Sequence, residues 1–365
     1  MNKLPRDIVH DIFSRLPIRC LCLSRCVCKN WYNTISSPSF TTLQIKIASN
    51  ENNHHFLLNH KNSLVGRSDS HQLYFVENDE DLDANGLRKP IKVDIPFFNA
   101  SNMSDLIVMG SCNGLLCVSN VDWRCGVQSG RRYKNLSTLP SNPIYIFNPV
   151  TLEQLPLPMF IYPECMKIEE FSFGFGFDVV KQQYKAVLVM FYKYDVMSDY
   201  VENEVQVCTM GNTTWSREIG GVLDILINAY LSLSYVFVDG SLHWIVMKDP
   251  DSPTCRSVIV SFQLGVEEFT TISTPKSIVM NQEGREWSEI LGQAICYTEE
   301  FGVKSRSLDV DEIHAPGCNS IEVVPIVASF ISIKSACGMA RHTEKLPLRQ
   351  VEVKDHHRKF GCCLQ

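Results

Sequence analysis

The stretch LPRDIVHDIFSRLPIRCLCLSRCVCKNWYNTISSPSF, residues 4–40, carries the strongest local pattern in the chain. Apolar residues from Ile8 to Leu16 recur every three or four positions, which predicts an amphipathic helix. The helix is expected to begin near Pro5, because proline suits a first helical turn. Pro17 disfavours helical backbone at the residue before it and is expected to end the helix.

Two shorter helices are expected after this one. They cover about residues 18–25 and 28–35, and Pro38 is expected to end the second of them. Three helices within about forty residues bury little apolar surface. Domains of this size usually need a metal, a disulfide or a partner to be stable.

Four cysteines lie within this helical stretch, at positions 20, 22, 26 and 28. If they are helical, their side chains point at about 0°, 200°, 240° and 80° around the axis. They do not converge on one point, as the ligands of a tetrahedral zinc ion must. We therefore expect cysteines that act as small buried hydrophobic residues, and a partner as the source of stability.

Residues 4–40 resemble the F-box, with Leu-Pro, Arg-Leu-Pro and Val-Cys-Lys-x-Trp at the family's spacing. The resemblance implies docking on the Skp-type adaptor of a cullin–RING ubiquitin ligase. By position, the residues that would make or support this interface are Leu4, Pro5, Ile8, Leu16, Pro17, Leu21, Val27, Cys28 and Trp31. The alternative for any of them, Ile8 and Val27 especially, is that the residue only holds the helices together.

The composition of the 365-residue chain sets limits on its class. It is 45% hydrophobic, and 34 basic against 40 acidic residues give a net charge of −6, which does not indicate a nucleic-acid binder. Its 15 cysteines are too sparse for a disulfide scaffold. The N-terminal residues contain no signal-peptide core, so we expect a reducing compartment and free thiols. No stretch is expected to span a bilayer.

From about residue 106 onward the sequence predicts β-structure. Strand–turn–strand units begin at residues 144 (IYIFNPVTLEQLPLP), 205 (VQVCTMGNTTWSREI) and 258 (VIVSFQLGVEEFTTIS). Loose repeats of about fifty residues with several strands each are typical of a β-propeller. An open β-sandwich is the alternative.

Several motifs resemble the F-box-associated domain of plant F-box proteins, such as those of the S-locus F-box-like family. They are GSCNGLLCVSN (110–120), IFNPVTLEQLPLP (146–158), FGFGFDVVKQQYKAVLV (173–189), TTWSREI (213–219), DGSLHWIV (239–246) and VSFQLGVEEFTTISTP (260–275). The implied fold class is α+β multidomain, with a small three-helix F-box followed by a mostly antiparallel, propeller-like β domain.

The expected domains follow from these two resemblances. They are an F-box at 1–42, a connecting segment with the first short strands at 43–105, the F-box-associated domain at 106–297, and a divergent tail at 298–365. The tail does not continue the family pattern and is expected to be an alternative, partly disordered segment. A closed propeller needs its last blade, so a β domain that does not close is the alternative.

No catalytic constellation emerges from the sequence. Gly174 and Gly176 lack a third glycine at phosphate-loop spacing, and a strand rather than a helix is expected after them. His243 has no accompanying nucleophile motif and is expected to be a hydrogen-bonded packing residue. Cys112 and Cys117 are expected in the core of a hairpin. We expect no cofactor and no metal.

The resemblance implies a non-catalytic, substrate-recognition subunit of a Skp–cullin–F-box ubiquitin ligase, whose β domain binds a target protein for ubiquitination and degradation. The expected partners are the Skp-type adaptor, through it the cullin and RING subunits, and an unidentified target. One alternative is a decoy that captures no target, and another is a β-propeller enzyme with an accessory helical module. The expected location is the cytoplasm, the nucleus or both.

The final residues, CCLQ, fit the C-a-a-X pattern for prenylation, with Cys362 as the acceptor and Gln365 favouring a farnesyl group. Lys354, Arg358 and Lys359 supply the basic patch that a single lipid chain needs for membrane binding. The alternative is a chance ending in a cysteine-rich chain. Membrane association is expected only if Cys362 is prenylated.

Overall fold

The structure is a computed structural model of the 365-residue chain. It describes residues 5–50, 55–62, 70–76, 91–95, 106–119, 144–160, 167–193, 202–216, 229–231, 235–248, 256–272 and 320–337. The chain divides into two compact units, which are described separately. Unit 1 comprises residues 1–120, 144–155 and 308–365, and unit 2 comprises residues 121–143 and 156–307.

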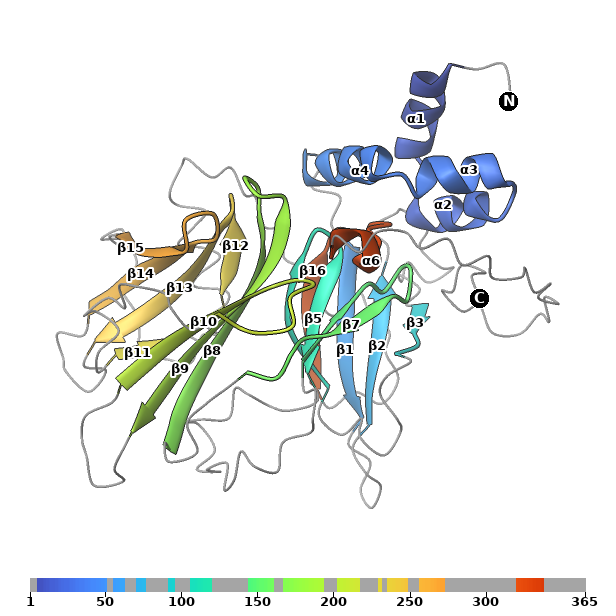
Figure 1. Cartoon of the computed structure of the whole chain (residues 1–365). Helices are drawn as coiled ribbons and strands as arrows, with labels where there is room; N and C mark the ends of the chain where they lie inside the picture. The colour runs from blue at the N-terminus through green and yellow to red at the C-terminus, as the bar shows by residue number, and fades with distance from the viewer. Residues whose placement is uncertain are drawn as a thin grey trace. The chain divides into compact units, whose positions relative to one another are not determined.

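Unit 1 begins with four short helices (Figure 1): α1 (Arg6–Ser14), α2 (Ile18–Arg25), α3 (Lys29–Ile35) and α4 (Pro38–Asn50). The first three lie where the sequence predicts them. Pro5 and Pro17 stand at the N-caps of α1 and α2, where their fixed φ suits the entry into a helix.

The fourth helix was not predicted. Pro38 was interpreted only as the end of the third helix, but it also begins α4. Ser37 caps the new helix, because its Oγ accepts a hydrogen bond from the Phe40 N–H at 3.3 Å. The Ser37-Pro38 pair therefore ends α3 and begins α4. This agrees with the preference for serine at the N-cap and proline at the first helical position.

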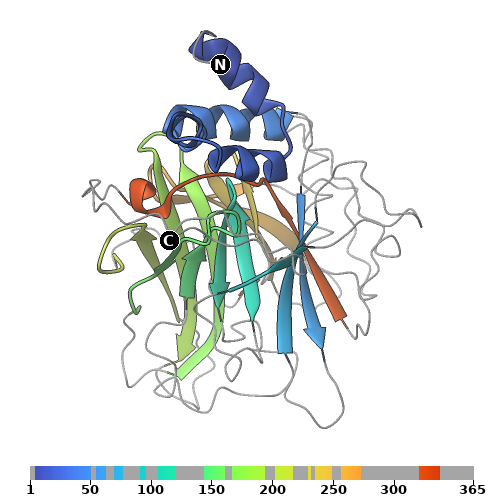
Figure 2. The same ribbon diagram turned by 90° about the vertical axis from the view of Figure 1, so that its right-hand side faces the viewer.

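The first sheet of unit 1 joins strands from distant parts of the sequence. Its order is β16 (Ser320–Ile326), β1 (His55–Asn62), β2 (Ser70–Val76) and β3 (Ile91–Val93). The β16 strand pairs antiparallel along β1, from His55 opposite Ile326 to Lys61 opposite Ser320. Red β16 and blue β1 lie side by side in Figures 1 and 2. A strand and the short helix α6 (Ile333–Ala336) thus lie within the predicted tail.

The second sheet of unit 1 has the order β4 (Ile107–Cys112), β5 (Leu115–Ser119), β6 (Ile144–Phe147) and β7 (Gln154–Pro156). Asn113 and Gly114, with φ of 50° and 87°, form the two-residue turn between β4 and β5. Cys112 and Cys117 are buried, as predicted. Burial raises the pKa of both thiols, so they stay protonated.

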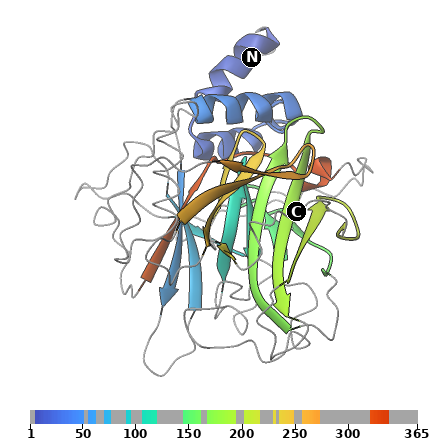
Figure 3. The same cartoon turned by 90° about the vertical axis from the view of Figure 1, so that its left-hand side faces the viewer.

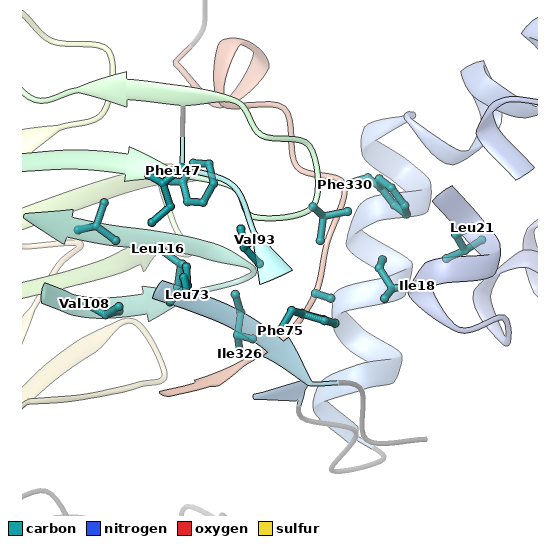
Figure 4. Close-up of a cluster of buried hydrophobic side chains, with 14 of the residues drawn as sticks. Ile18, Leu21, Leu73, Phe75, Val93, Val108, Leu116, Phe147, Ile326 and Phe330 are labelled. Carbon is teal, nitrogen blue, oxygen red and sulfur yellow. The ribbon is translucent and has the colours of Figure 1, made fainter. Parts of the chain in front are cut away.

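Helices and sheets of unit 1 share one hydrophobic core (Figure 4). The helices contribute Phe13, Ile18, Leu21, Ile35 and Phe40. The sheets contribute Leu73, Phe75, Val93, Leu116, Phe147 and Ile326, and Phe330 follows β16. The N-terminal helices, which are too small to be stable alone, therefore bury part of their apolar surface against the sheets of unit 1.

Unit 2 contains two antiparallel sheets (Figures 1 and 3). The first has the order β10 (Glu202–Thr209), β9 (Gln183–Lys193) and β8 (Lys167–Asp178). The second has the order β11 (Ala229–Leu231), β13 (Ser241–Lys248), β14 (Arg256–Gln263) and β15 (Glu268–Ile272), with β12 (Val236–Val238) also paired to β13. The core between them includes Val187, Val205, Trp244, Val260 and Phe262.

The predicted fold class is confirmed, because short N-terminal helices precede antiparallel sheets. The strand–turn–strand units expected from residues 144 and 258 are β6–β7 and β14–β15. The domain boundaries stay a prediction.

Candidate functional site

The N-terminal helices leave large apolar side chains in water. Ile8 and Ile12 of α1 are 47% and 39% exposed, and Leu23 of α2 and Val27 after it are 66% and 64% exposed. Within each pair the residues are four positions apart, so the two side chains share a face if the spacing is helical. Exposed apolar side chains on neighbouring helical turns are typical of protein interaction sites. We call these four residues the helix surface.

The structure places the predicted interface residues at different depths. Pro5, Ile8, Val27 and Cys28 are exposed, Leu16, Pro17 and Trp31 are half-buried, and Leu21 is fully buried in the core. Leu4 lies outside the described residues. In this arrangement Leu21 can support an interface only from beneath, by holding the helices in place. The assignment of these residues to the adaptor stays a prediction.

Trp31 packs against another aromatic ring and is also partly exposed to solvent. Its ring lies edge-on to Phe13 with centroids 5.1 Å apart, and Phe13 in turn packs edge-on against Phe40 at 6.4 Å. Part of the Trp31 side chain remains accessible. Truncating it would therefore loosen the helices as well as any interface.

Two residues of the helix surface were missing from the predicted interface. Ile12 was assigned to the apolar face of the first helix but not to the interface, although it is exposed. Leu23 carried a usable signal, because it lies about 200° around the helix from the buried Leu21.

The four clustered cysteines are free thiols. The expectation that they are buried is wrong for Cys20, Cys26 and Cys28, which are exposed, while Cys22 is half-buried. The four side chains point in different directions around α2 and its C-terminal end. Only one side of this helix faces the core, so most of the thiols are exposed. Among the described residues, no group of three or more histidine, cysteine, aspartate or glutamate side chains could hold a metal ion.

Arg25 links the helices to the segment that follows β16. Its side chain is only 8% exposed. The guanidinium carbon lies 5.0 Å from the ring centroid of Tyr32 and 4.7 Å from that of Phe330. Both distances suit cation–π contacts. Unit 1 thus joins α2 and α3 to a residue about three hundred positions later in the chain.

Asn148 fixes that same C-terminal segment to the second sheet. It is fully buried, and its Nδ2 donates to the carbonyl oxygens of Ser329 at 3.1 Å and Ile331 at 2.9 Å. The Ser329 hydroxyl donates to the Asn113 carbonyl at 2.6 Å. The Glu153 carboxylate accepts from the Ile333 N–H at 2.6 Å. These bonds satisfy backbone groups that strand pairing leaves open.

Unit 2 contains a buried lysine at the end of its hairpins. The Lys185 ammonium is 3.1 Å from Asp178 Oδ2 and 2.7 Å from Glu267 Oε1, and it donates to the Leu264 carbonyl at 2.6 Å. Burial acts to raise the pKa of the Asp178 carboxyl. Hydrogen bonds from the Lys181 and Val180 N–H groups, together with the Lys185 charge, outweigh burial and lower this pKa below its usual value.

Two other residues discussed in the sequence analysis, His243 and Gly174, are packed in the core and not arranged as a reactive site. Burial lowers the pKa of His243, and a backbone hydrogen bond with Val238 partly offsets this effect, as befits a packing histidine. Gly174 packs against Leu242 and Trp244 and not around a phosphate-sized opening. Cys362 lies outside the described residues, and its prenylation stays a prediction.

Within the part of the chain that the structure describes, no helix is long and apolar enough to cross a membrane. The exposed apolar side chains of the N-terminal helices are features of an interaction surface. Comparison with known families agrees. The model of the F-box domain matches residues 1–43, and that of the F-box associated beta propeller domain matches residues 62–299.

The chain therefore belongs to the F-box proteins with an F-box-associated β-propeller domain, as the sequence predicted. It is similar to three proteins of Arabidopsis thaliana. F-box protein At3g07870 is 26% identical over 308 residues, which are 80% of this chain and 65% of that protein. F-box protein CPR1 is 27% identical, with coverages of 76% and 62%. F-box protein DOR is 24% identical, with coverages of 77% and 65%. The chain thus spans less than two thirds of the length of these relatives.

Proposed function

We propose that the chain is the substrate-recognition subunit of a Skp–cullin–F-box ubiquitin ligase. The observation that carries the proposal is the helix surface: Ile8, Ile12, Leu23 and Val27 are exposed within the segment that matches the F-box. A Skp-type adaptor would cover these side chains and would connect the chain to cullin and RING subunits. The β domain would bind the target protein.

In this role the chain positions the target protein, and other subunits catalyse the transfer of ubiquitin. Holding a target beside a ubiquitin-loaded enzyme raises the local concentration of the target's lysines, which accelerates transfer without any catalytic residue in the receptor. The proposed sites of action are the cytoplasm and the nucleus. Fluorescence microscopy of the tagged chain, with the adaptor as a co-marker, tests this location.

The adaptor interface is best tested at exposed residues, because their replacement leaves the core intact. Leu23→Asp/Val27→Asp places two charges on the helix surface and should weaken adaptor binding about 30-fold or more, since interface hot spots contribute about 2 kcal/mol or more each. The measurement is titration of the purified chain with the purified adaptor. Unchanged affinity in the double variant would contradict the proposal.

The matched control is Met159→Asp, which adds a charge at an apolar side chain of unit 2 that is 37% exposed. This variant should bind the adaptor like the wild type. Trp31→Ala is a weaker test, because the Trp31 ring also packs against Phe13. Circular dichroism of every variant shows whether the helices are still formed.

The decoy alternative differs in one measurable result. A receptor lowers the abundance of its targets when it is expressed, and proteasome inhibition restores them. A decoy binds the adaptor equally well, yet no protein changes in abundance through it. Quantitative proteomics of cells that express the wild type or Leu23→Asp/Val27→Asp, with and without a proteasome inhibitor, separates these outcomes.

A further inference from the structure

Three exposed valines lie on hairpin turns of unit 2. Val179 and Val180, in the turn between β8 and β9, are 55% and 80% exposed. Val266, in the turn between β14 and β15, is 59% exposed. Among the described residues, the other exposed large hydrophobic side chains are the four of the helix surface and Met159. The valines are thus the main exposed apolar feature of unit 2 in the described part of the chain.

These valines do not help to form their turns. Tight turns favour glycine, proline, asparagine, aspartate and serine, and β-branched residues prefer strands. The β8–β9 turn is held instead by Asp178, whose Oδ1 accepts the N–H groups of Val180 and Lys181, both at 3.0 Å. An exposed, β-branched residue that breaks a local preference without a gain in folding indicates a functional position.

The turns form one surface. The Leu264 N–H donates to the Gly240 carbonyl at 3.0 Å, which joins the β14–β15 turn to the β12–β13 turn. A Cβ atom on Gly265 would lie 3.8 Å from Val180 Cγ2, and one on Gly240 would lie 3.5 Å from Val179 Cγ2. Both distances are in the van der Waals range, so Val180 lies beside Gly265 and Val179 lies beside Gly240. Figures 1 and 3 show these turns at the same end of the two sheets. We call Val179, Val180, Gly265 and Val266 the turn platform.

The turn platform is held firmly from beneath. Lys185, only 1% exposed, reaches the Asp178 carboxylate below one turn and the Leu264 carbonyl and Glu267 carboxylate of another. Such a bridge joins the β8–β9 turn to the β14–β15 turn. A surface fixed in advance loses less conformational entropy when it binds a partner.

The charges around the turn platform are unbalanced. The turns and their edges contain the lysines Lys181 and Lys185 and the carboxylates Asp178, Asp239, Glu267 and Glu268. Of these, Lys181, Asp239 and Glu268 are exposed. The excess of carboxylates produces a negative potential, which attracts basic groups and repels acidic ones.

We propose that the turn platform is the docking surface for the target protein, and that it takes a target segment in which an apolar side chain is flanked by lysine or arginine. The valines would receive the apolar side chain, and Asp239 and Glu268 would select for the basic neighbours. This inference rests on the proposed function, because a target protein is the occupant that a substrate receptor requires.

Selection from a random peptide library displayed on phage tests the proposal. The bait is the full chain in complex with the purified adaptor. The wild type should enrich peptides that combine an apolar residue with adjacent lysine or arginine. Val179→Ser/Val180→Ser/Val266→Ser should lose this enrichment, and synthetic versions of the enriched peptides should bind it at least tenfold more weakly in fluorescence anisotropy.

Two further variants separate apolar from charge recognition. Asp239→Asn/Glu268→Gln should still enrich apolar residues but lose the preference for basic ones. Met159→Ser, which removes another exposed apolar side chain of unit 2, should behave like the wild type. Absence of enrichment, enrichment of acidic peptides, or equal enrichment by the wild type and the triple serine variant would overturn the proposal.

Other occupants give different results. If a second copy of the chain covers the turn platform, light scattering should show a dimer for the wild type and a monomer for the triple serine variant. If the adaptor covers it, the triple serine variant should lose adaptor affinity. Either result would also overturn the assignment to a target. The proposed function fails separately, through unchanged adaptor binding by Leu23→Asp/Val27→Asp.

Discussion

Lys185 shows how one residue can control the stability of unit 2. Lys185→Met keeps the length of the side chain but leaves the buried Asp178 carboxylate without its ion-pair partner. Breaking one side of a buried pair usually costs about 3–5 kcal/mol, so the free energy of unfolding should fall by that amount. Urea unfolding of the full chain, followed by tryptophan fluorescence, measures the change.

A double variant provides the control for this prediction. Lys185→Met/Asp178→Asn removes both charges and should be more stable than Lys185→Met alone, because no unpaired charge stays buried. If Lys185→Met unfolds at the same urea concentration as the wild type, the ion pair does not stabilise the fold.

The Asp178 carboxyl also makes stability depend on pH. Its pKa is lower in the folded chain than the usual value of 3.8, so the unfolded chain binds the proton more readily. This contribution to stability is fully present above the usual pKa and is lost as the pH falls through the folded-state value. Unfolding of Asp178→Asn should therefore depend less on pH than that of the wild type in the acid range below about pH 4. Parallel acid dependences would contradict this assignment.

At the scale of elements, the cysteine-rich helix α2 offers a prediction about metal. Cys20→Ser/Cys22→Ser removes two thiols whose directions diverge by about 200°. We expect this variant to bind the adaptor within about threefold of the wild type, because neither thiol belongs to the helix surface. The wild-type chain should contain no stoichiometric zinc by elemental analysis. One equivalent of zinc that is lost in the double variant would contradict the geometric argument.

The prediction at the scale of the whole molecule concerns the end of unit 1. A chain that stops after residue 319 lacks β16, the partner of β1, and also Phe330, which contacts Arg25. The loss of a strand and of buried Ile326 and Phe330 should be comparable to the roughly 5–15 kcal/mol that stabilise most domains, so unit 1 should not fold cooperatively. Differential scanning calorimetry measures the missing transition.

The matched control stops after residue 337. It keeps β16, Asn148's partners Ser329 and Ile331, and α6. Its melting temperature should stay close to that of the full chain. If both shortened chains melt alike, the contacts of β16 do not stabilise unit 1.

Local patterns in the sequence predicted much of the fold. The helical spacing from Ile8 to Leu16 and the Leu-Pro pairs predicted α1 and α2, because side-chain period and proline geometry act within a few residues. The alternation and turn residues around 144 and 258 predicted hairpins for the same reason. The exposure of Cys20, Cys26 and Cys28 was predicted wrongly, since burial depends on which side of a helix meets the core.

The candidate sites were predicted less completely than the fold. The F-box pattern predicted an adaptor interface on α1 to α3, which stays a prediction, and it omitted Ile12 and Leu23, which only the packing shows to be exposed. The turn platform could not be predicted, because Val180 and Gly265 are 85 positions apart and lie side by side only once the β8–β9 and β14–β15 hairpins are packed together. Such contacts depend on the pairing of whole hairpins.

The sequence by itself determined the family, the N-terminal helices and the antiparallel hairpins, because each of these depends on residues that are close together in the chain. The tertiary structure decided that β16 completes the sheet of β1, that Phe330 and Tyr32 enclose Arg25, and that the β8–β9 and β14–β15 turns meet at one buried lysine. These features join residues up to 305 positions apart, as in Arg25 and Phe330. Their loop-closure entropy must be offset by burial and hydrogen bonds of the complete fold, which no local pattern contains.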